Sequence, residues 1–530
     1  MDPSIGGQPG PKRRRCKCKY KIRWFYSKGA FLVLVWVLLS TLSLSSFVTL
    51  QAIRHNKLNH SFEWLFAILV SVAAATILLL GWLANTKAKL GVYKVAKFGF
   101  VLLFLATFIT SVATLFLEYD FTKNQYITNI FICSIQVLYI VGAGASIVST
   151  LHLGLDQMPD ASSSSITSFV AWLVFNFSVS KWIIEILFNN YLKCLMNDNG
   201  QYPANTIQLW SLFPVSCMSI VIVTDFLFAK KWLIILPKSS HTLRIAYQVL
   251  KFAAKHKAPL NRSALTYWEE DIPSRMDLGK LRYGGPFTTE QVEDVKTVLR
   301  LLVISLPLWV LSLSVSYGPV SYKVPLITEV FPNSTSCSSY KLFAFTYKSE
   351  WWALITAVLN EFVIYPLLKD KLPSILKRIG MVAIISFVLS VIFLILTLVH
   401  HFFNNEKPLW VVSVSFYASR GVLYYLLFCA VLELVCAQAP YNMKGFFTGY
   451  FTGLIITSFG LGSSSTGHPS HIYCSDCILF GVKSCVSLFG FVLYCLLAHW
   501  YKKRVRDEEY NAQTVVEEVY DRYLNPSITN

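Results

Sequence analysis

The sequence is poor in charge. Charged residues make up 14% of the 530 residues, whereas apolar residues make up 54% and the mean hydropathy is +0.51. A soluble domain carries about a quarter charged residues. This composition excludes an ordinary soluble domain and indicates an integral membrane protein.

Acidic residues are the scarcer of the two signs, with 29 Asp and Glu against 47 Lys and Arg and a net charge of +18. The basic surplus stands beside apolar segments, which is typical of loops on the cytoplasmic side of a membrane. We therefore expect no nucleic-acid partner. The sequence also lacks a Gly-rich nucleotide-binding motif and any spacing typical of a catalytic triad. We expect neither an enzyme nor an ATP-driven pump, and neither a cofactor nor a metal.

Long apolar runs dominate the chain. Runs of about 17–25 residues are long enough for a helix to cross a hydrocarbon core of ~30 Å, and these do not alternate as barrel strands would. We therefore expect an all-α membrane protein. The twelve predicted spans lie near residues 29–51, 62–84, 96–117, 129–152, 166–189, 206–229, 297–317, 351–368, 376–400, 409–437, 445–464 and 478–500.

A charged belt, residues 230–296, divides the spans into two groups of six. It must be aqueous, because each charge at the bilayer centre costs about 2.5–3.5 kcal/mol. The chain is thus divided into a basic arm (1–28), a first half (29–229), the belt, a second half (297–500) and a tail (501–530). With an even number of spans, both termini, the belt and the Lys- and Arg-rich loops fall on one side, which the positive-inside rule makes cytoplasmic.

Residues 241–257 of the belt predict an amphipathic helix with a basic face. Such a helix lies either on the anionic leaflet or against the underside of the protein. On the opposite side of the membrane, the sequons at Asn59 and Asn333 predict glycosylation. That side is oxidising, which favours disulfides over a zinc site. The cysteines expected there are Cys194, Cys337, Cys474 and Cys477.

Three local motifs stand at the ends of predicted spans. The first follows the second span and includes Gly81, Asn85, Gly91 and Lys94; the second lies in and after the fourth span and includes Gly142, Gly144, Asp156 and Gln157; the third ends the tenth span with Glu433, Gln438 and Pro440. They resemble, in order, motifs of the proton-dependent oligopeptide transporter family of the major facilitator superfamily. The resemblance implies the major facilitator fold, with twelve transmembrane helices in two six-helix halves, and gating or loop roles for the matching residues. These are Gly81, Asn85, Gly91, Lys94, Gly142, Gly144, Asp156, Gln157, Glu433, Gln438 and Pro440.

The coupling residues of that family are largely missing. The first span has no charged residue over positions 30–49, where the family carries a paired-acid-and-arginine motif. Ile147 stands where the family has a coupling Lys, and Tyr424 stands where its tenth helix has a peptide-binding Glu. Peptide–proton symport is therefore not implied residue by residue, and protons remain a candidate coupling ion.

Ionisable residues inside spans are candidates for substrate binding or coupling, because they are costly unless paired or hydrated. Lys181 and Glu185 share one helical face, and form either a structural pair or part of a site. Glu361 and Arg420 either pair across the second half or line a cavity in which Arg420 holds a carboxylate. Aromatic residues at similar depth, which either line the cavity or pack, are Tyr139, Trp172, Trp309 and Tyr424.

Two functions fit these observations. The first is a secondary active transporter of small organic solutes, peptide-like or carboxylate-bearing, working by alternating access. The second is a transporter-like receptor or scaffold that no longer transports, which the missing coupling residues favour. The first agrees better with the motifs that are kept. The expected partners are a small-molecule solute and the lipid bilayer, with the protein in the plasma membrane or an endolysosomal membrane.

Overall fold

The structure is a computed structural model of the chain. It describes residues 27–55, 91–116, 125–158, 163–187, 204–234, 242–256, 274–316, 349–368, 373–403, 409–440, 443–464 and 475–501. Several predictions fall outside these residues. They concern the second span with Gly81 and Asn85, the sequons at Asn59 and Asn333, and Cys194, Cys337 and Cys474.

Helices account for nearly all of the described structure, which contains no strand beyond an isolated bridge between Lys280 and Phe287. The first half comprises α1 (Lys28–His55), α3 (Gly91–Phe116), α4 (Gln125–Asp156), α5 (Ser163–Leu187) and α6 (Ala204–Trp232). The belt holds α7 (Thr242–Lys255) and two 3₁₀ turns, η5 (Asp277–Gly279) and η6 (Leu281–Tyr283). The second half comprises α8 (Thr289–Ser316), α11 (Ser349–Leu359), the π-helical η7 (Asn360–Ile364), α12 (Tyr365–Leu368), α13 (Ile375–Phe403), α14 (Leu409–Gln438), α15 (Lys444–Ser464) and α16 (Ser475–Trp500).

Within the described residues, ten helical segments are long and apolar enough to cross a bilayer. Their outward surfaces are greasy: Phe226 is 80% exposed, Leu496 65% and Phe489 61%. Exposing so much apolar surface to water along whole helices is unfavourable, whereas the lipid of a bilayer would cover it. The chain is therefore an integral, multi-pass membrane protein.

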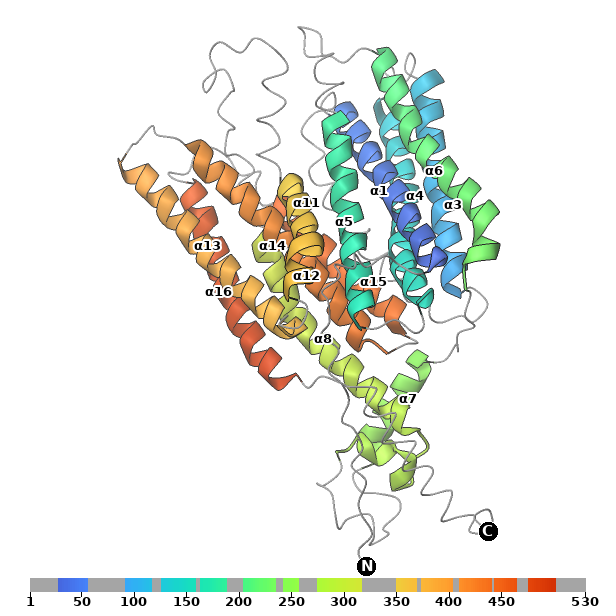
Figure 1. Cartoon of the computed structure of the whole chain (residues 1–530), viewed down its shortest axis with the longest axis vertical. Helices are drawn as coiled ribbons and strands as arrows, with labels where there is room; N and C mark the ends of the chain where they lie inside the picture. The colour runs from blue at the N-terminus through green and yellow to red at the C-terminus, as the bar shows by residue number, and fades with distance from the viewer. Residues whose placement is uncertain are drawn as a thin grey trace, which may run out of the picture.

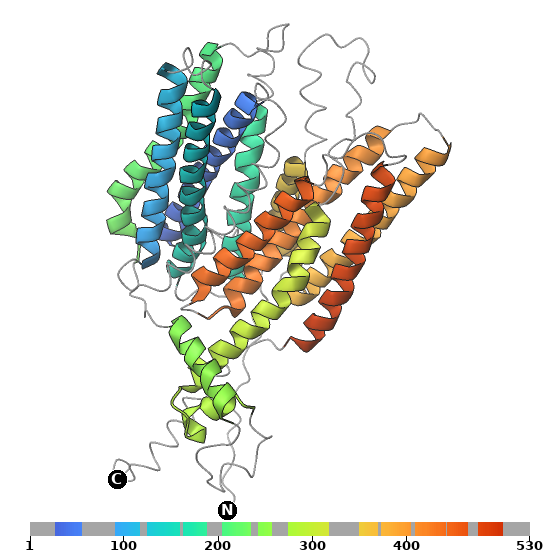
Figure 2. The ribbon, with the colours of Figure 1, turned by 180° about the vertical axis from the view of Figure 1, so that it is seen from behind.

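The helices form two bundles, drawn blue to green and yellow to red in Figures 1 and 2. In the first, α1 packs on α5 and α6, and α3 packs on α4; in the second, α8 packs on α15 and α16, and α11 on α14. The bundles meet where α5 contacts α11 and α14, and where α4 contacts α15. The helix α7 lies beyond one end of the bundles (Figure 1), which we call the belt end.

The helix α8 begins about two turns earlier than the predicted span, inside the stretch assigned to the belt. A capping box starts it: the Thr288 backbone N–H donates to Gln291 Oε1 (3.1 Å), and the Gln291 N–H donates to Thr288 Oγ1 (3.3 Å). This reciprocal pair satisfies two of the free donors at a helix start. The belt therefore ends in helix, and α8 reaches beyond the bundle to α7.

The amphipathic helix α7 uses its apolar face within the protein. Ala246 and Val249 of α7 are buried against Val292 and Val295 of α8. Of the two placements considered for this helix, packing against the protein itself is the one observed. Its basic residues lie on the other face, where Lys251 is exposed.

A four-residue ionic clamp fixes the belt beside this contact. Lys280 Nζ lies 2.7 Å from both Asp277 Oδ1 and Glu293 Oε1, and Lys296 Nζ lies 2.5 Å and 2.9 Å from the same two atoms. Burial alone would raise the pKa of Asp277, but hydrogen bonds from Lys280, Lys296 and Ser274 outweigh it and lower that pKa. Burial would lower the pKa of Lys280, but the two acids outweigh it and raise that pKa.

The clamp predicts how the belt responds to pH. The contribution of Asp277 is complete above its ordinary pKa of about 3.9 and is lost as the pH falls through its lower folded-state value. That of Lys280 is complete below about 10.4 and is lost as the pH rises through its raised value. We expect Asp277→Asn to increase amide hydrogen exchange of α7 at neutral pH, as measured by mass spectrometry. The exposed Glu290→Gln is the matched control, and equal exchange in both variants would refute the clamp's role.

Close backbone approach holds α3 against α4. A Cβ on Gly142 would lie 2.9 Å from the Leu103 backbone nitrogen, and one on Gly99 would lie 2.7 Å from the Ser146 nitrogen. Both distances are too short for a side chain, so these glycines let the helices touch through their backbones. Gly144 follows in the same helix α4.

Gly142→Ala is expected to lower the thermal stability of the detergent-solubilised protein, because overpacking costs about 1–3 kcal/mol. Gly481→Ala in α16 is the control, since nothing lies within 4 Å of its added Cβ. That control should gain slightly, by up to about 1 kcal/mol, from helix propensity. Equal melting temperatures for the two variants would contradict the close approach.

Candidate functional site

A small polar group joins the two halves near the belt end. Glu433 of α14 is 6% exposed, and its Oε1 accepts hydrogen bonds from Arg378 Nη2 of α13 (2.6 Å) and Thr167 Oγ1 of α5 (2.9 Å). The Arg378–Glu433 pair lies within the second half, whereas Thr167 reaches it from the first. We call these three residues the latch. A buried carboxylate needs such partners, and they hold the halves together here.

Glu361 makes a second contact between the halves, one residue along α5. Its Oε2 accepts a hydrogen bond from Ser168 Oγ at 3.3 Å. Glu361 lies in η7, where the helix widens before Pro366. Proline lacks an N–H and crowds the carbonyl four residues earlier, and π-helical turns of this kind are frequent at functional sites.

The structure describes other contacts for Glu361 and Arg420 than the pairing predicted between them. Glu361 meets Ser168 from the first half instead, and the acid that acts electrostatically on Arg420 is Glu350 of α11. The Glu361–Arg420 ion pair stays a prediction. The two residues lie on different helices, and sequence spacing does not show which way each helix faces.

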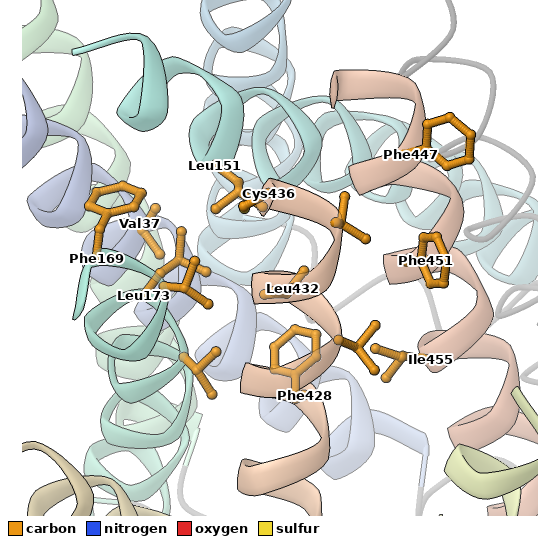
Figure 3. Close-up of a cluster of buried hydrophobic side chains, with 14 of the residues drawn as sticks. Val37, Leu151, Phe169, Leu173, Phe428, Leu432, Cys436, Phe447, Phe451 and Ile455 are labelled. Carbon is orange, nitrogen blue, oxygen red and sulfur yellow. The ribbon is translucent and has the colours of Figure 1, made fainter. Parts of the chain in front are cut away.

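An apolar plug fills the interface between the halves (Figure 3). Val37, Leu151, Phe169 and Leu173 from the first half belong to the same buried cluster as residues of the second half. The second-half members drawn there are Phe428, Leu432, Cys436, Phe447, Phe451 and Ile455. With the latch, the plug closes the space between the halves at the belt end.

The interface between the two halves, which we also call the seam, is polar and more open at the end opposite the belt end. Lys181 Nζ of α5 lies 4.0 Å from Glu350 Oε1 of α11, with side-chain exposures of 57% and 31%. Trp182 stacks on Trp351 beside them, with ring centroids 5.3 Å apart. Glu185 lies one turn along α5, and its side chain is outside the described set.

Arg420 lies next to this ion pair and is half-buried in α14. The following Gly421 lets α11 come close, because a Cβ there would collide with the Ser349 carbonyl oxygen and lie 2.9 Å from the Ala353 nitrogen. Within the described residues, no hydrogen bond or ion pair is recorded for the Arg420 guanidinium. Its planar set of N–H donors suits a carboxylate.

Lys483 of α16 was not among the sequence candidates. It is 7% exposed, and its Nζ lies 4.7 Å from the centroid of the Phe416 ring, one turn before Arg420 on α14. Lys483 and Arg420 are close enough to repel electrostatically. A lone Lys inside the apolar run 478–500 was the signal that could have found it.

The predicted aromatic residues lie in the two halves rather than around one point. Tyr139 is buried and stacks on Phe47 at 3.9 Å. Tyr424 stacks on Phe428 at 5.7 Å, and Trp172 of α5 meets Phe362 of η7 edge-on at 6.0 Å across the interface between the halves. Trp309 lines a small apolar pocket within the second half.

The motif residues at the belt end tie helix ends together. Gln157 Oε1 accepts from the Ile234 backbone N–H (2.7 Å), and its Nε2 donates to the Ile234 carbonyl (3.0 Å), joining the end of α4 to the end of α6. Asp156 Oδ1 lies 3.5 Å from His152 Nε2. Gln438 Oε1 accepts from the Tyr501 hydroxyl at 3.3 Å. Of the others, Gly91 (φ +56°) and the exposed Lys94 start α3, and Pro440 is buried after α14.

Cysteine and metal chemistry is limited in the described part of the chain. Cys477 is disulfide-bonded. Among the described residues, no group of three or more His, Cys, Asp or Glu side chains is placed to hold a metal ion.

Known structures resemble this one along nearly its whole length. An auto-inhibited peptide transporter of the POT family superposes with a TM-score of 0.56, covering 90% of this chain and 98% of its own at 15% identity. A bacterial homologue of the iron transporter ferroportin, in an outward-facing state, gives 0.55 over 89% and 99% at 14% identity. The major facilitator proton:xylose symporter XylE gives 0.51 over 88% and 94% at 13% identity. No family model matches the sequence.

The chain has the major facilitator fold. The fold class predicted from the sequence is thereby confirmed, and each predicted span within the described residues is helical, whereas the count of twelve spans stays a prediction. The peptide transporter and the ferroportin homologue fit about equally well, so the fold does not choose between their substrates.

The latch predicts a measurable opening. Thr167→Val removes a hydrogen bond to a carboxylate, worth about 1.5–3 kcal/mol, so N-ethylmaleimide should label Cys436 of the plug about tenfold faster or more. Cys217, which is free and buried inside the first half, is the internal reference, and mass spectrometry distinguishes the two thiols.

The control variant is Thr107→Val, because the Thr107 hydroxyl bonds only carbonyls of its own helix α3. It should leave Cys436 labelling unchanged. If Thr167→Val also leaves it unchanged, or raises labelling of Cys217 equally, the latch does not hold the halves together.

Proposed function

We propose that this protein is a secondary active transporter of small organic solutes that bear a carboxylate. It moves them by rocking its two halves about a central site. The observation that carries the proposal is the unequal closure of the α5–α11 seam. Latch and plug seal the belt end, whereas Lys181 at the other end is more than half exposed.

The contacts between the halves suit repeated opening. A hydroxyl–carboxylate bond at Thr167, another at Ser168 and apolar side chains can separate without leaving a bare pair of opposite charges. The strong ion pair, Arg378 with Glu433, lies inside one half and moves with it. A rocking motion therefore breaks weak contacts and keeps the strong one.

The substrate class is inferred from charge. Lys181 and Arg420 stand beside a single described acid, Glu350, at the open end of the seam. A carboxylate supplied by the solute would balance the second cation, and Arg420 can hold it through two parallel hydrogen bonds. Tyr424 lies one helical turn after Arg420 on α14, and Trp172 lies on α5 at the interface between the halves. We assign both side chains to the walls of the same path.

We place the belt end in the cytoplasm, in line with the basic loops. The conformation is then closed toward the cytoplasm. Coupling to protons does not follow from the family's usual residues, which this chain lacks. Glu361, set in a π-helical turn between the halves, is the acid best placed for coupling.

Uptake into proteoliposomes tests this function. Labelled monocarboxylates and labelled di- and tripeptides are supplied with and without an inward proton gradient. We expect saturable uptake of carboxylate solutes, and Arg420→Gln should raise the half-saturating concentration roughly 30-fold or more, because a buried charge partner is lost. The exposed Arg244→Gln on α7 is the control and should transport normally.

Each result decides something different. Uptake that ignores the gradient keeps transport and removes proton symport. Uptake that is equal in Arg420→Gln and the wild type removes the carboxylate clamp. No uptake of any tested solute, together with tight binding of a cytosolic protein, would leave the receptor or scaffold as the function.

A further inference from the structure

The lysine in α16 lies in an environment that is unfavourable for a permanent cation. Lys483 is 7% exposed, and the contact recorded for its ammonium in the described residues is the face of the Phe416 ring, 4.7 Å from the centroid. Phe393, Phe416 and Phe480 form a buried aromatic cluster around this point. A single ring attracts an ammonium by less than the cost of removing it from water.

In the part of the chain that the structure describes, the charged groups on the neighbouring helices do not compensate it. On α14 the facing groups are Tyr417 and Arg420, and Arg420 is itself a cation that repels Lys483. The remaining charged residues of these helices sit toward helix ends, at Glu433 on α14, at Lys377, Arg378, His400 and His401 on α13, at Glu290, Glu293, Asp294, Lys296 and Arg300 on α8, and at Asp476 and His499 on α16. Glu350 lies beside Arg420 and is shared with Lys181.

One cation, Lys483, therefore lies over an aromatic ring of α14, and a second, Arg420, is carried by the same helix. Phe416 and Arg420 are four residues apart and share a face of the helix. Lys483 lies about two turns after the start of α16 and approaches that face of α14. Neither Lys483 nor Arg420 has a recorded hydrogen bond in the described residues, so their N–H donors are available to a ligand.

We infer that Arg420, Lys483 and Phe416 form an anion subsite in the second half, which takes the carboxylate of an organic monoanion. The inference rests on the proposed function and deepens it by placing the carboxylate between α14 and α16. Arg420 supplies the bidentate donor pair, Lys483 the second charge and Phe416 an apolar wall.

The arrangement links anion and proton. A buried ammonium without a counterion tends to release its proton, and an anion beside it restores the charged form. By linkage, an anion that binds the protonated form brings a proton with it. The proton adds to Lys483 Nζ when the carboxylate enters and leaves when the carboxylate leaves, so an anion and a proton move together.

Benzoate binding to the purified full-length protein, in nanodiscs of phosphatidylcholine, tests the subsite. Benzoate should raise the melting temperature of the wild type in a saturable way. Isothermal titration in buffers of different ionisation enthalpy should show proton uptake on binding. Lys483→Met should weaken benzoate binding roughly 30-fold or more and abolish the proton uptake, while raising the melting temperature of the ligand-free protein.

Matched variants separate charge from packing. Lys251→Met removes an exposed lysine of α7 and should bind benzoate as the wild type does. Lys483→Arg keeps the charge and should bind within a few-fold of the wild type, without proton uptake.

The opposite results overturn the subsite. If Lys483→Met fails to fold or melts lower without ligand, the ammonium is a structural partner of Phe416. If benzoate binds that variant normally, the carboxylate lies elsewhere. If chloride saturates the same Lys483-dependent shift and benzoate adds nothing, the occupant is an inorganic ion. Binding without uptake would keep the subsite and refute transport, whereas uptake that is normal in Lys483→Met would do the reverse.

Discussion

Hydrocarbon offers neither hydrogen bonds nor counterions, and most of this structure follows from that constraint. It makes every described span helical, because a helix satisfies its own backbone. It also turns buried hydroxyls back on their own helices, as Thr107, Thr110 and Thr114 do along α3. Buried acids in the second half have polar partners for the same reason. Glu433 pairs with Arg378, and Glu361 accepts a hydrogen bond from Ser168.

The same constraint gives the molecule two unlike ends. At the belt end, polar contacts are short, buried and backed by the apolar plug, so the halves act as one body there. At the other end the halves touch through a longer, half-exposed ion pair and a tryptophan stack. A protein with the major facilitator fold needs such a difference between its ends if only one side of the membrane is to reach the centre at a time.

The sequence predicts the parts of this structure that depend on local properties. The lengths of the apolar runs predict the spans. The spacing of Thr288 and Gln291 matches a capping box, which is the pair that starts α8. Pro366 likewise marks the π-helical turn. What the sequence does not give is helix rotation, and rotation decides that Glu361 of η7 meets Ser168 of α5. Lys483 could be read as a charge in an apolar run, but its position over Phe416 depends on packing between α14 and α16.

The helix α8 continues without a break from the belt into the second half over 28 residues. Its first turns carry Glu293 and Lys296 of the clamp, and its deeper turns bind α15 through Ser305 to Tyr450 and Ser312 to Ser458. A stiff rod anchored at both levels transmits any tilt of the second half directly to α7. The angle of α7 therefore follows the second half, and a spectroscopic label on α7, outside the bundles, would detect a movement of that half.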